Sequence, residues 1–155
     1  MKTLIIYTSQ TGFTKRYAEW IAEKMSGELL DLRDARKKSA DHFKDFDAIC
    51  YGGWAMAGNL VKGKWFLEKA SDWHDKRLAM FCVGGSPNDN PDVDAFLQNV
   101  LTEEQKKYIK VFSYRTGDQF CDKFSDINRT VVVLSNFAND IGFAFGDHVI
   151  LRLIQ

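Results

Sequence analysis

The chain is poor in proline and carries no net charge. Only two prolines, Pro87 and Pro91, occur in its 155 residues, and no stretch has the composition of a linker. We therefore expect one domain over residues 1–155, a length that supports a proper core. Lysine plus arginine and aspartate plus glutamate balance at 21 each, which gives no argument for binding nucleic acid.

The sequence also lacks the marks of a membrane or disulfide-rich protein. No uncharged run approaches the roughly 20 apolar residues that cross a bilayer, and the N-terminus does not have the pattern of a signal peptide. The cysteines, Cys50, Cys82 and Cys121, are widely spaced and form no C-x-x-C pair. We expect reduced, buried thiols and a cytoplasmic protein. The histidines are scattered and have no metal-site spacing, so no metal is predicted.

Short apolar runs are present instead, and they alternate with helical patterns. The runs are continuous, which indicates strands buried on both faces of a parallel sheet. Repeated β-α alternation predicts the α/β class, with a doubly wound sheet and helices on both of its faces. The predicted strands are Thr3–Thr8, Glu28–Leu32, Asp47–Gly53, Arg77–Gly85 and Ile109–Tyr114.

Apolar residues spaced by three and four positions predict the helices. The predicted helix at Pro91–Lys107 should break near Thr102, because Thr102 and Gln105 have the spacing of a capping box. From Ser125 onward the pattern predicts a long or kinked helix, although residues 131–134 are also compatible with a strand. The earlier helices are predicted from Phe13 to Met25, at Asp41–Asp45, at Val61–Trp73 and at Pro91–Lys107.

The most informative segment lies between the first predicted strand and the first helix, and reads Ser9-Gln10-Thr11-Gly12-Phe13-Thr14. A helix N-terminus presents unpaired N–H groups and partial positive charge, which together bind phosphate. The hydroxyl side chains add donors, and the glycine permits close backbone approach. Since the segment holds no lysine or arginine, we expect it to bind an anion mainly through neutral donors.

Other interpretations of this segment were weighed against a phosphate loop. A dinucleotide fingerprint needs G-x-G-x-x-G, whereas only one glycine is present here. A Walker A loop is approached by residues 58–64, but Trp65 stands where the hydroxyl belongs and the match does not follow the first strand. A plain polar turn, in which Ser9 or Thr11 only caps the helix, is the simplest alternative.

The segment resembles the phosphate loop of the flavodoxin family, where an aromatic-ended strand precedes hydroxyl-x-x-Gly-x-Thr. Residues 5–14 fit this pattern position by position, and Ala18 lies where the signature has a small residue. The resemblance implies a flavodoxin-like five-stranded parallel sheet of order 2-1-3-4-5, with FMN as the cofactor. It also implies that Ser9, Gln10, Thr11, Gly12, Phe13 and Thr14 surround the FMN phosphate.

The same resemblance places the flavin ring against the segment after the third predicted strand. There Gly52 and Gly53 would let the backbone come close, and Trp54 would stack on the ring. Ala55 and Met56 follow in the same segment, with the methionine as a soft contact. The alternative is that Trp54 is an ordinary core aromatic.

The segment after the fourth predicted strand is expected to complete the flavin site. The backbone N–H groups of Gly84, Gly85 and Ser86 would meet the polar edge of the ring. This segment lacks the aromatic residue that electron-transfer members usually present, which would leave one face of the ring open. A plain surface turn is the alternative.

Three functions are compatible with these features. The first is an FMN protein that passes electrons to or from a partner enzyme. The second is an FMN-dependent oxidoreductase acting on a planar substrate such as a quinone or tetrapyrrole, and the third is a flavin-free binding module. In its neutral charge, its short loops and its basic and aromatic C-terminal helix, the chain resembles the branch of the family that includes menaquinone-dependent protoporphyrinogen dehydrogenase. No side chain is expected to act as a catalytic acid or base.

A small basic cluster lies after the second predicted strand and has two aspartates among its members. Such a cluster is typical of a solvated surface, and a docking role is the alternative. Its members are Arg33, Arg36, Lys37 and Lys38, with Asp31 and Asp34 beside them.

Overall fold

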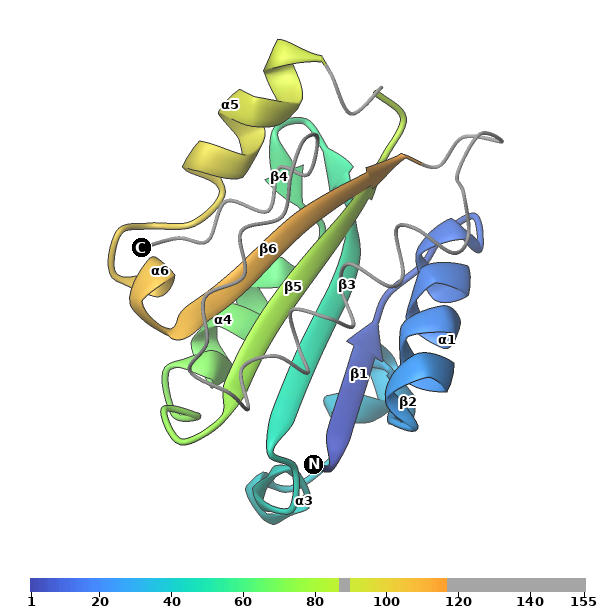
Figure 1. The fold of residues 1–155 in the computed structure, drawn as a ribbon, viewed down its shortest axis with the longest axis vertical. Helices are drawn as coiled ribbons and strands as arrows, with labels where there is room; N and C mark the ends of the chain where they lie inside the picture. Colours follow the sequence, from blue (N-terminus) through green and yellow to red (C-terminus); the bar gives the residue numbers. More distant parts are fainter. Residues whose placement is uncertain (87–89, 117–155) are drawn as a thin grey trace.

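Figure 1 shows the protein as a computed structural model, which describes residues 1–86 and 90–116. Three predictions lie outside the described residues: the last helix from Ser125, the alternative strand at residues 131–134, and Cys121. No helix in the described part is long and apolar enough to cross a bilayer.

Five parallel strands form the main sheet, in the order β2-β1-β3-β5-β6. Without the short β4, this is the predicted order 2-1-3-4-5, so the flavodoxin-like topology is confirmed. All five residues of β1 are buried, because helices cover both of its faces. The strands are β1 (Thr3–Tyr7), β2 (Glu28–Asp31), β3 (Ala48–Met56), β5 (Arg77–Gly84) and β6 (Ile109–Thr116).

Strand β3 is longer than predicted, so the segment after the third predicted strand begins later than the sequence indicated. The sequence placed its end at Gly53, whereas the strand continues to Met56 and turns back into the antiparallel strand β4 (Asn59–Leu60). The two turn residues, Ala57 and Gly58, have φ of 50° and 75°, as two-residue hairpin turns of the primed type require. Trp54 and Ala55 therefore lie in a strand and not in a loop.

Helices lie on both faces of the sheet, as predicted (Figure 1). Helix α1 keeps its predicted bounds, whereas α4 is shorter than predicted. Helix α2 was not predicted, because four residues are too few to show a helical period. The helices are α1 (Phe13–Met25), α2 (Leu32–Ala35), α3 (Ala40–Lys44), α4 (Gly63–Ala70), α5 (Pro91–Asn99) and α6 (Gln105–Tyr108).

The predicted break near Thr102 is confirmed between α5 and α6. The Thr102 N–H donates to Oε1 of Gln105 at 2.9 Å, and the Gln105 N–H donates to Oγ1 of Thr102 at 3.2 Å. These two reciprocal bonds are those of a capping box, and they satisfy N–H groups that the chain exposes where a helix begins.

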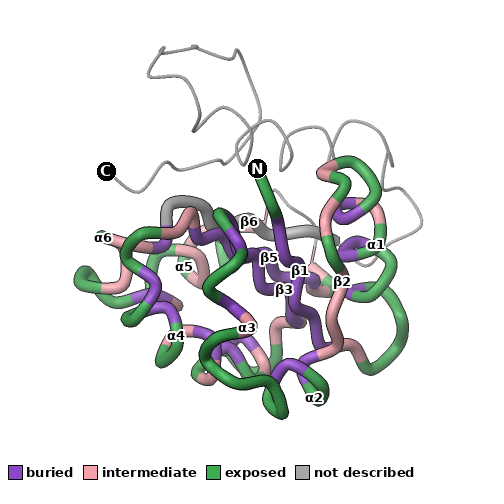
Figure 2. The backbone as a smooth tube through the Cα atoms, turned by 90° about the horizontal axis from the view of Figure 1, so that it is seen from below, coloured by how far each residue is buried: buried purple, intermediate pink, exposed green. Residues whose placement is uncertain are grey.

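Two hydrophobic cores fill the space between the sheet and the helices, and Figure 2 shows the buried strands at the centre. On one face, Tyr17 and Ile21 of α1 pack with Ile5 and Phe81. The other face is larger and includes Tyr51 stacked on Phe66 at 5.4 Å between ring centroids. Cys50 and Cys82 are free and buried, as predicted, and burial raises the pKa of each thiol to about 12.

Close packing explains the glycine pair of β3. A Cβ on Gly52 would lie inside the ring of Phe81, its partner on β5, and a Cβ on Gly53 would lie 3.0 Å from both Leu60 Cδ1 and the Val61 carbonyl oxygen. Protein atoms fill the space beside each glycine, so packing alone accounts for the absence of a side chain; close approach of a ligand to their backbone stays a prediction.

Replacing Gly52 by alanine should destabilise the fold by about 1–3 kcal/mol, because the added methyl group overlaps the buried Phe81 ring. Denaturant unfolding of the protein measures this loss. The matched control is Gly85→Ala, whose Cβ would meet nothing within 4 Å, and this change should stay within about 0.5 kcal/mol. Equal stability of the two variants would show that Phe81 has room to move.

Candidate functional site

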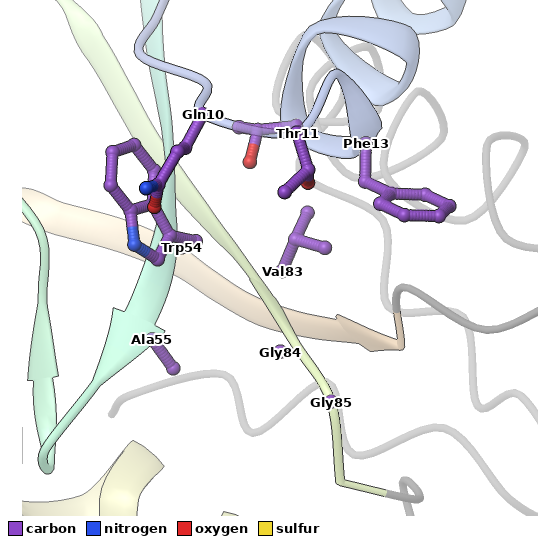
Figure 3. Close-up of a pocket in the computed structure, with 9 residues that line it drawn as sticks. Gln10, Thr11, Phe13, Trp54, Ala55, Val83, Gly84 and Gly85 are labelled. Atoms are coloured by element: carbon purple, nitrogen blue, oxygen red, sulfur yellow. The ribbon is translucent and has the colours of Figure 1, made fainter.

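A cavity of about 430 Å³ lies at the carboxyl edge of the sheet, close to the N-terminus of α1. Figure 3 shows the residues of its wall, with Trp54 and Phe13 on opposite sides of Thr11. The wall comes from three segments: the loop after β1 together with the start of α1, the end of β3, and the end of β5 with the residue after it. Its residues are Gln10, Thr11, Phe13, Thr14, Trp54, Ala55, Val83, Gly84 and Gly85.

The sheet supplies one side of the cavity through a matched pair of residues. Trp54 of β3 and Val83 of β5 are register partners on neighbouring parallel strands, so their side chains leave the sheet on the same face. Two residues earlier on each strand, the Phe81 ring fills the place beside Gly52. Trp54 and Val83 therefore lie next to a position of the sheet, Gly52 with Phe81, where no empty space is left.

The loop after β1 is held by its own hydrogen bonds. The Thr8 N–H donates to the carbonyl of Gly52 at 2.9 Å, which continues the pairing of β1 with β3. The Gly12 N–H donates to the Ser9 hydroxyl at 3.1 Å. Gly12 itself has a φ of 95°, a left-handed conformation that favours glycine. Ser9 and Gly12 thus shape the loop, and neither lines the cavity.

Helix α1 begins beside this cavity without a side-chain cap. Gly12 is its N-cap residue and has no side chain that could cap the first turn. Ser9 accepts a hydrogen bond from the N–H of Gly12 itself, a bond that the alternative of a plain polar turn before the helix would also have. Thr14 is only 3% exposed although it belongs to the cavity wall. Uncapped N–H groups beside a cavity are suited to an anion.

The structure brings eight of the predicted site residues into one wall and leaves five outside it. The five are Ser9, Gly12, Gly53, Met56 and Ser86. Met56 is exposed at the tip of the hairpin, and Gly53 is buried beneath it. Residues 87–89, in the segment after the fourth predicted strand, lie outside the described part of the chain.

Sequence analysis missed one wall residue, Val83. It lies in an apolar run that is typical of a buried strand, and its neighbours in the run are of the same residue type. Only its register opposite Trp54 marks it, and that register was hidden while Trp54 was assigned to a loop.

None of the described residues of the wall is ionisable, so the wall offers no side chain for acid or base catalysis. In the described part of the chain, no three His, Cys, Asp or Glu residues are grouped as metal ligands would be. The chemistry that the wall supports is therefore binding and orientation through neutral donors, aromatic surface and backbone.

Basic side chains lie outside the cavity, where β2 and β4 end, and we call Arg33, Arg36 and Lys62 the basic border. Partial burial raises the pKa of the Asp31 carboxyl, but hydrogen bonds from Arg33 and the charges of Arg33 and Lys62 outweigh it and hold that pKa below its usual value. Burial raises the pKa of the Tyr51 phenol, and the nearby Arg36 guanidinium opposes the rise.

Backbone contacts join the basic border to the cavity. The Val61 N–H donates to the carbonyl of Trp54 at 2.9 Å, and the Tyr51 hydroxyl donates to the carbonyl of Val61 at 2.9 Å. Lys62 follows directly, so its backbone is held next to the strand that carries Trp54.

Comparison with solved structures shows the same fold in several flavodoxins. The flavodoxin, WrbA-like protein from Agrobacterium tumefaciens has a TM-score of 0.62 and 21% identity, covering 88% of this chain and 96% of that one. Flavodoxin 1 from Bacillus cereus has a TM-score of 0.59 and 16% identity, covering 92% of this chain and all, 100%, of that one.

Sequence comparison adds a relative and a family. Over 71 residues the chain is 27% identical to the flavodoxin of Haemophilus influenzae, a segment that makes up 46% of this chain and 36% of that protein. A model of the family described as "Flavodoxin domain" matches residues 4–137. Because that match covers most of the sequence and the parallel sheet agrees with it, the chain belongs to the flavodoxin family.

Proposed function

We propose that the chain binds FMN in the cavity at the carboxyl edge of the sheet and transfers electrons through it. Membership of the flavodoxin family implies flavin binding. The observation that carries the proposal is the uncapped N-terminus of α1 beside a cavity that also contains Trp54. One end of that cavity suits a phosphate and the other suits a flat aromatic ring.

The phosphate end depends on neutral donors. N–H groups at the start of α1 would hold the phosphate, helped by the hydroxyls of Thr11 and Thr14 and by the partial charge of the helix. Gln10 is exposed in the same loop and lines the cavity, so its amide can serve as a further donor. Ser9 contributes indirectly, since its bond to the Gly12 N–H holds the loop.

The ring end has an aromatic side chain and open backbone. Trp54 would stack on the flavin, and Ala55 would let the ring lie close to β3. A Cβ on Gly85 would meet nothing within 4 Å, so the backbone of Gly84 and Gly85 leaves room for the ring. A cavity of about 430 Å³ lies within the usual range for cofactor sites. When bound, FMN supplies one- and two-electron chemistry, and the protein orients it and tunes its potential.

A second function is favoured by one observation. Gly84, Gly85 and Ser86 carry no aromatic side chain that could cover the second face of the ring. An open face would admit a planar substrate such as a quinone or tetrapyrrole, which would make the chain an oxidoreductase. Rapid-mixing kinetics separate the two functions: a carrier accepts electrons from a reductase protein, whereas an oxidoreductase turns over a quinone with NAD(P)H.

The first experiment is the absorption spectrum of the purified protein, followed by titration of the apoprotein with FMN and with riboflavin. We expect a flavin spectrum and release of FMN on denaturation. FMN should bind much more tightly than riboflavin, because only FMN carries the phosphate. A protein that binds neither would be the flavin-free module.

Replacing Thr11 and Thr14 by valine should weaken FMN binding by about 1.5–3 kcal/mol for each hydroxyl, because each removes a hydrogen bond to a charged group. Valine keeps the shape of threonine, so the fold should persist. Riboflavin affinity should not change. The matched control is Thr102→Val, which removes a helix cap far from the cavity and should lower stability without changing FMN affinity. Unchanged FMN affinity in the double variant contradicts the phosphate assignment.

Replacing Trp54 by leucine should raise the flavin potential, because a stacked electron-rich ring disfavours the added negative charge of the reduced flavin. A stacking energy of about 0.5–1.5 kcal/mol corresponds to about 10–30 mV for a two-electron couple. Spectroelectrochemistry measures the shift, with Trp73→Leu in the core as the control. An unchanged potential in Trp54→Leu would mean that Trp54 does not contact the ring.

A further inference from the structure

Two exposed apolar side chains flank the cavity. Phe13 is 40% exposed and belongs to the cavity wall, and Met56 is 63% exposed and follows the wall residue Ala55. Apart from Met1, they are the only large hydrophobic side chains that the described residues expose. Exposed apolar groups gathered at a cavity mouth are typical of an interface.

The basic border carries three positive charges, against the nearby carboxylates of Asp31 and Asp34. Arg33 is paired with Asp31 at 3.2 Å, whereas the described residues contain no ion pair to Arg36 or Lys62 within the salt-bridge distance of 4.0 Å. Both side chains are exposed. This part of the sheet edge thus has more positive than negative charge, although the whole chain is neutral.

Local structure does not explain why a lysine stands at position 62. Its φ is 56°, a left-handed conformation that costs a non-glycine residue about 1–2 kcal/mol. It is the N-cap residue of α4, yet its side chain makes no capping bond. Neither the backbone conformation nor the start of α4 therefore requires a lysine side chain at this position.

Acidic side chains lie at the start of α5, which follows the end of β5. Asp92 and Asp94 occupy the first turn of that helix. Figure 1 shows α5 and α1 on opposite sides of the sheet edge. The face around the cavity therefore has basic residues at β2 and β4 and acidic residues at α5.

We propose that this face docks an acidic surface of a protein redox partner, with Phe13 and Met56 at the apolar centre and the basic border as the complementary charge. The proposal rests on the proposed function, since docking here would bring the partner close to the flavin. A small anionic substrate fits less well, because the basic side chains lie outside the cavity and no charged residue lines it. Small-ligand sites are concave and need convergent groups.

The test measures binding of an acidic plant-type ferredoxin to the apoprotein and the FMN-loaded protein, with basic cytochrome c as the opposite probe. The border variant is Arg36→Glu with Lys62→Glu. The control is Lys44→Glu with Lys69→Glu, two exposed lysines in the last turns of α3 and α4, at the other edge of the sheet. The change at Lys44 also breaks its ion pair with Asp41, so Lys69→Glu alone is measured beside it. Arg36→Gln with Lys62→Gln gives half the charge change and a second chance of a folded variant.

Ferredoxin affinity of the wild type should fall when salt is raised from about 0.01 M to about 0.15 M. In the border variant at low salt it should fall about tenfold, with an intermediate loss in the glutamine pair. The control pair should lose clearly less affinity than the border pair, because its lysines lie in the last turns of α3 and α4 and not at the carboxyl edge of the sheet. Met56→Ser should weaken binding without changing its salt dependence.

Three results would overturn the docking proposal. The first is a ferredoxin affinity that does not depend on salt or is lost equally in the border and control pairs. The second is self-association of the wild type that the border variant abolishes, which would assign the face to a second copy of the chain. The third is border-dependent binding of NADPH without that of ferredoxin. Failure of the proposed function is a separate result, because it appears as a lack of FMN binding while the apoprotein still tests docking.

Discussion

The packing of the Phe81 ring against Gly52 is the contact on which the candidate site depends. The ring fills the space above Gly52 on the face covered by α1, and Trp54 and Val83 follow two residues later as register partners. The carbonyl of Gly52 also accepts the Thr8 N–H, which sets where the loop after β1 begins. A side chain at Gly52 would therefore disturb the sheet wall and the loop together, because packed interiors transmit a change of one methyl group.

The parts of the fold that could be predicted from sequence are those that depend on neighbouring residues in the chain. Buried parallel strands have continuous apolar runs and α1 has a clear helical period, so the places of the strands and the bounds of α1 were predicted, whereas the strand order came from the resemblance to the flavodoxin family. Thr102 and Gln105 form a local motif and were predicted for the same reason. The end of β3 was wrong because a glycine pair usually marks a turn, whereas here the glycines make room for residues distant in sequence. The four residues of α2 gave no period at all.

The site residues that could be predicted are likewise those whose role depends on neighbours in the sequence, and the ones missed depend on contacts between distant segments. The loop from Gln10 to Thr14 was predicted because its residue types and their spacing before a helix carry the chemistry. Val83 was not, since only strand register sets it apart from its apolar neighbours. Met56 was assigned to the ring because β3 was thought to have ended. Once the strand runs on into a hairpin, Met56 becomes its exposed tip.

Because the cavity wall has only neutral donors, the basic side chains around it can contribute to the electrostatic field outside the cavity. A phosphate held by lysine or arginine would neutralise those side chains, and they would contribute little to the field outside. Here the wall contains no charged residue, and Arg36 and Lys62 lie at the border. With Asp92 and Asp94 on the other side, the face has charge of both signs at its rim and apolar groups at its centre. In the proposed docking, such a field would turn an approaching partner before contact, because it acts over about a Debye length, and the short-range apolar contact of Phe13 and Met56 would then fix the partner's position.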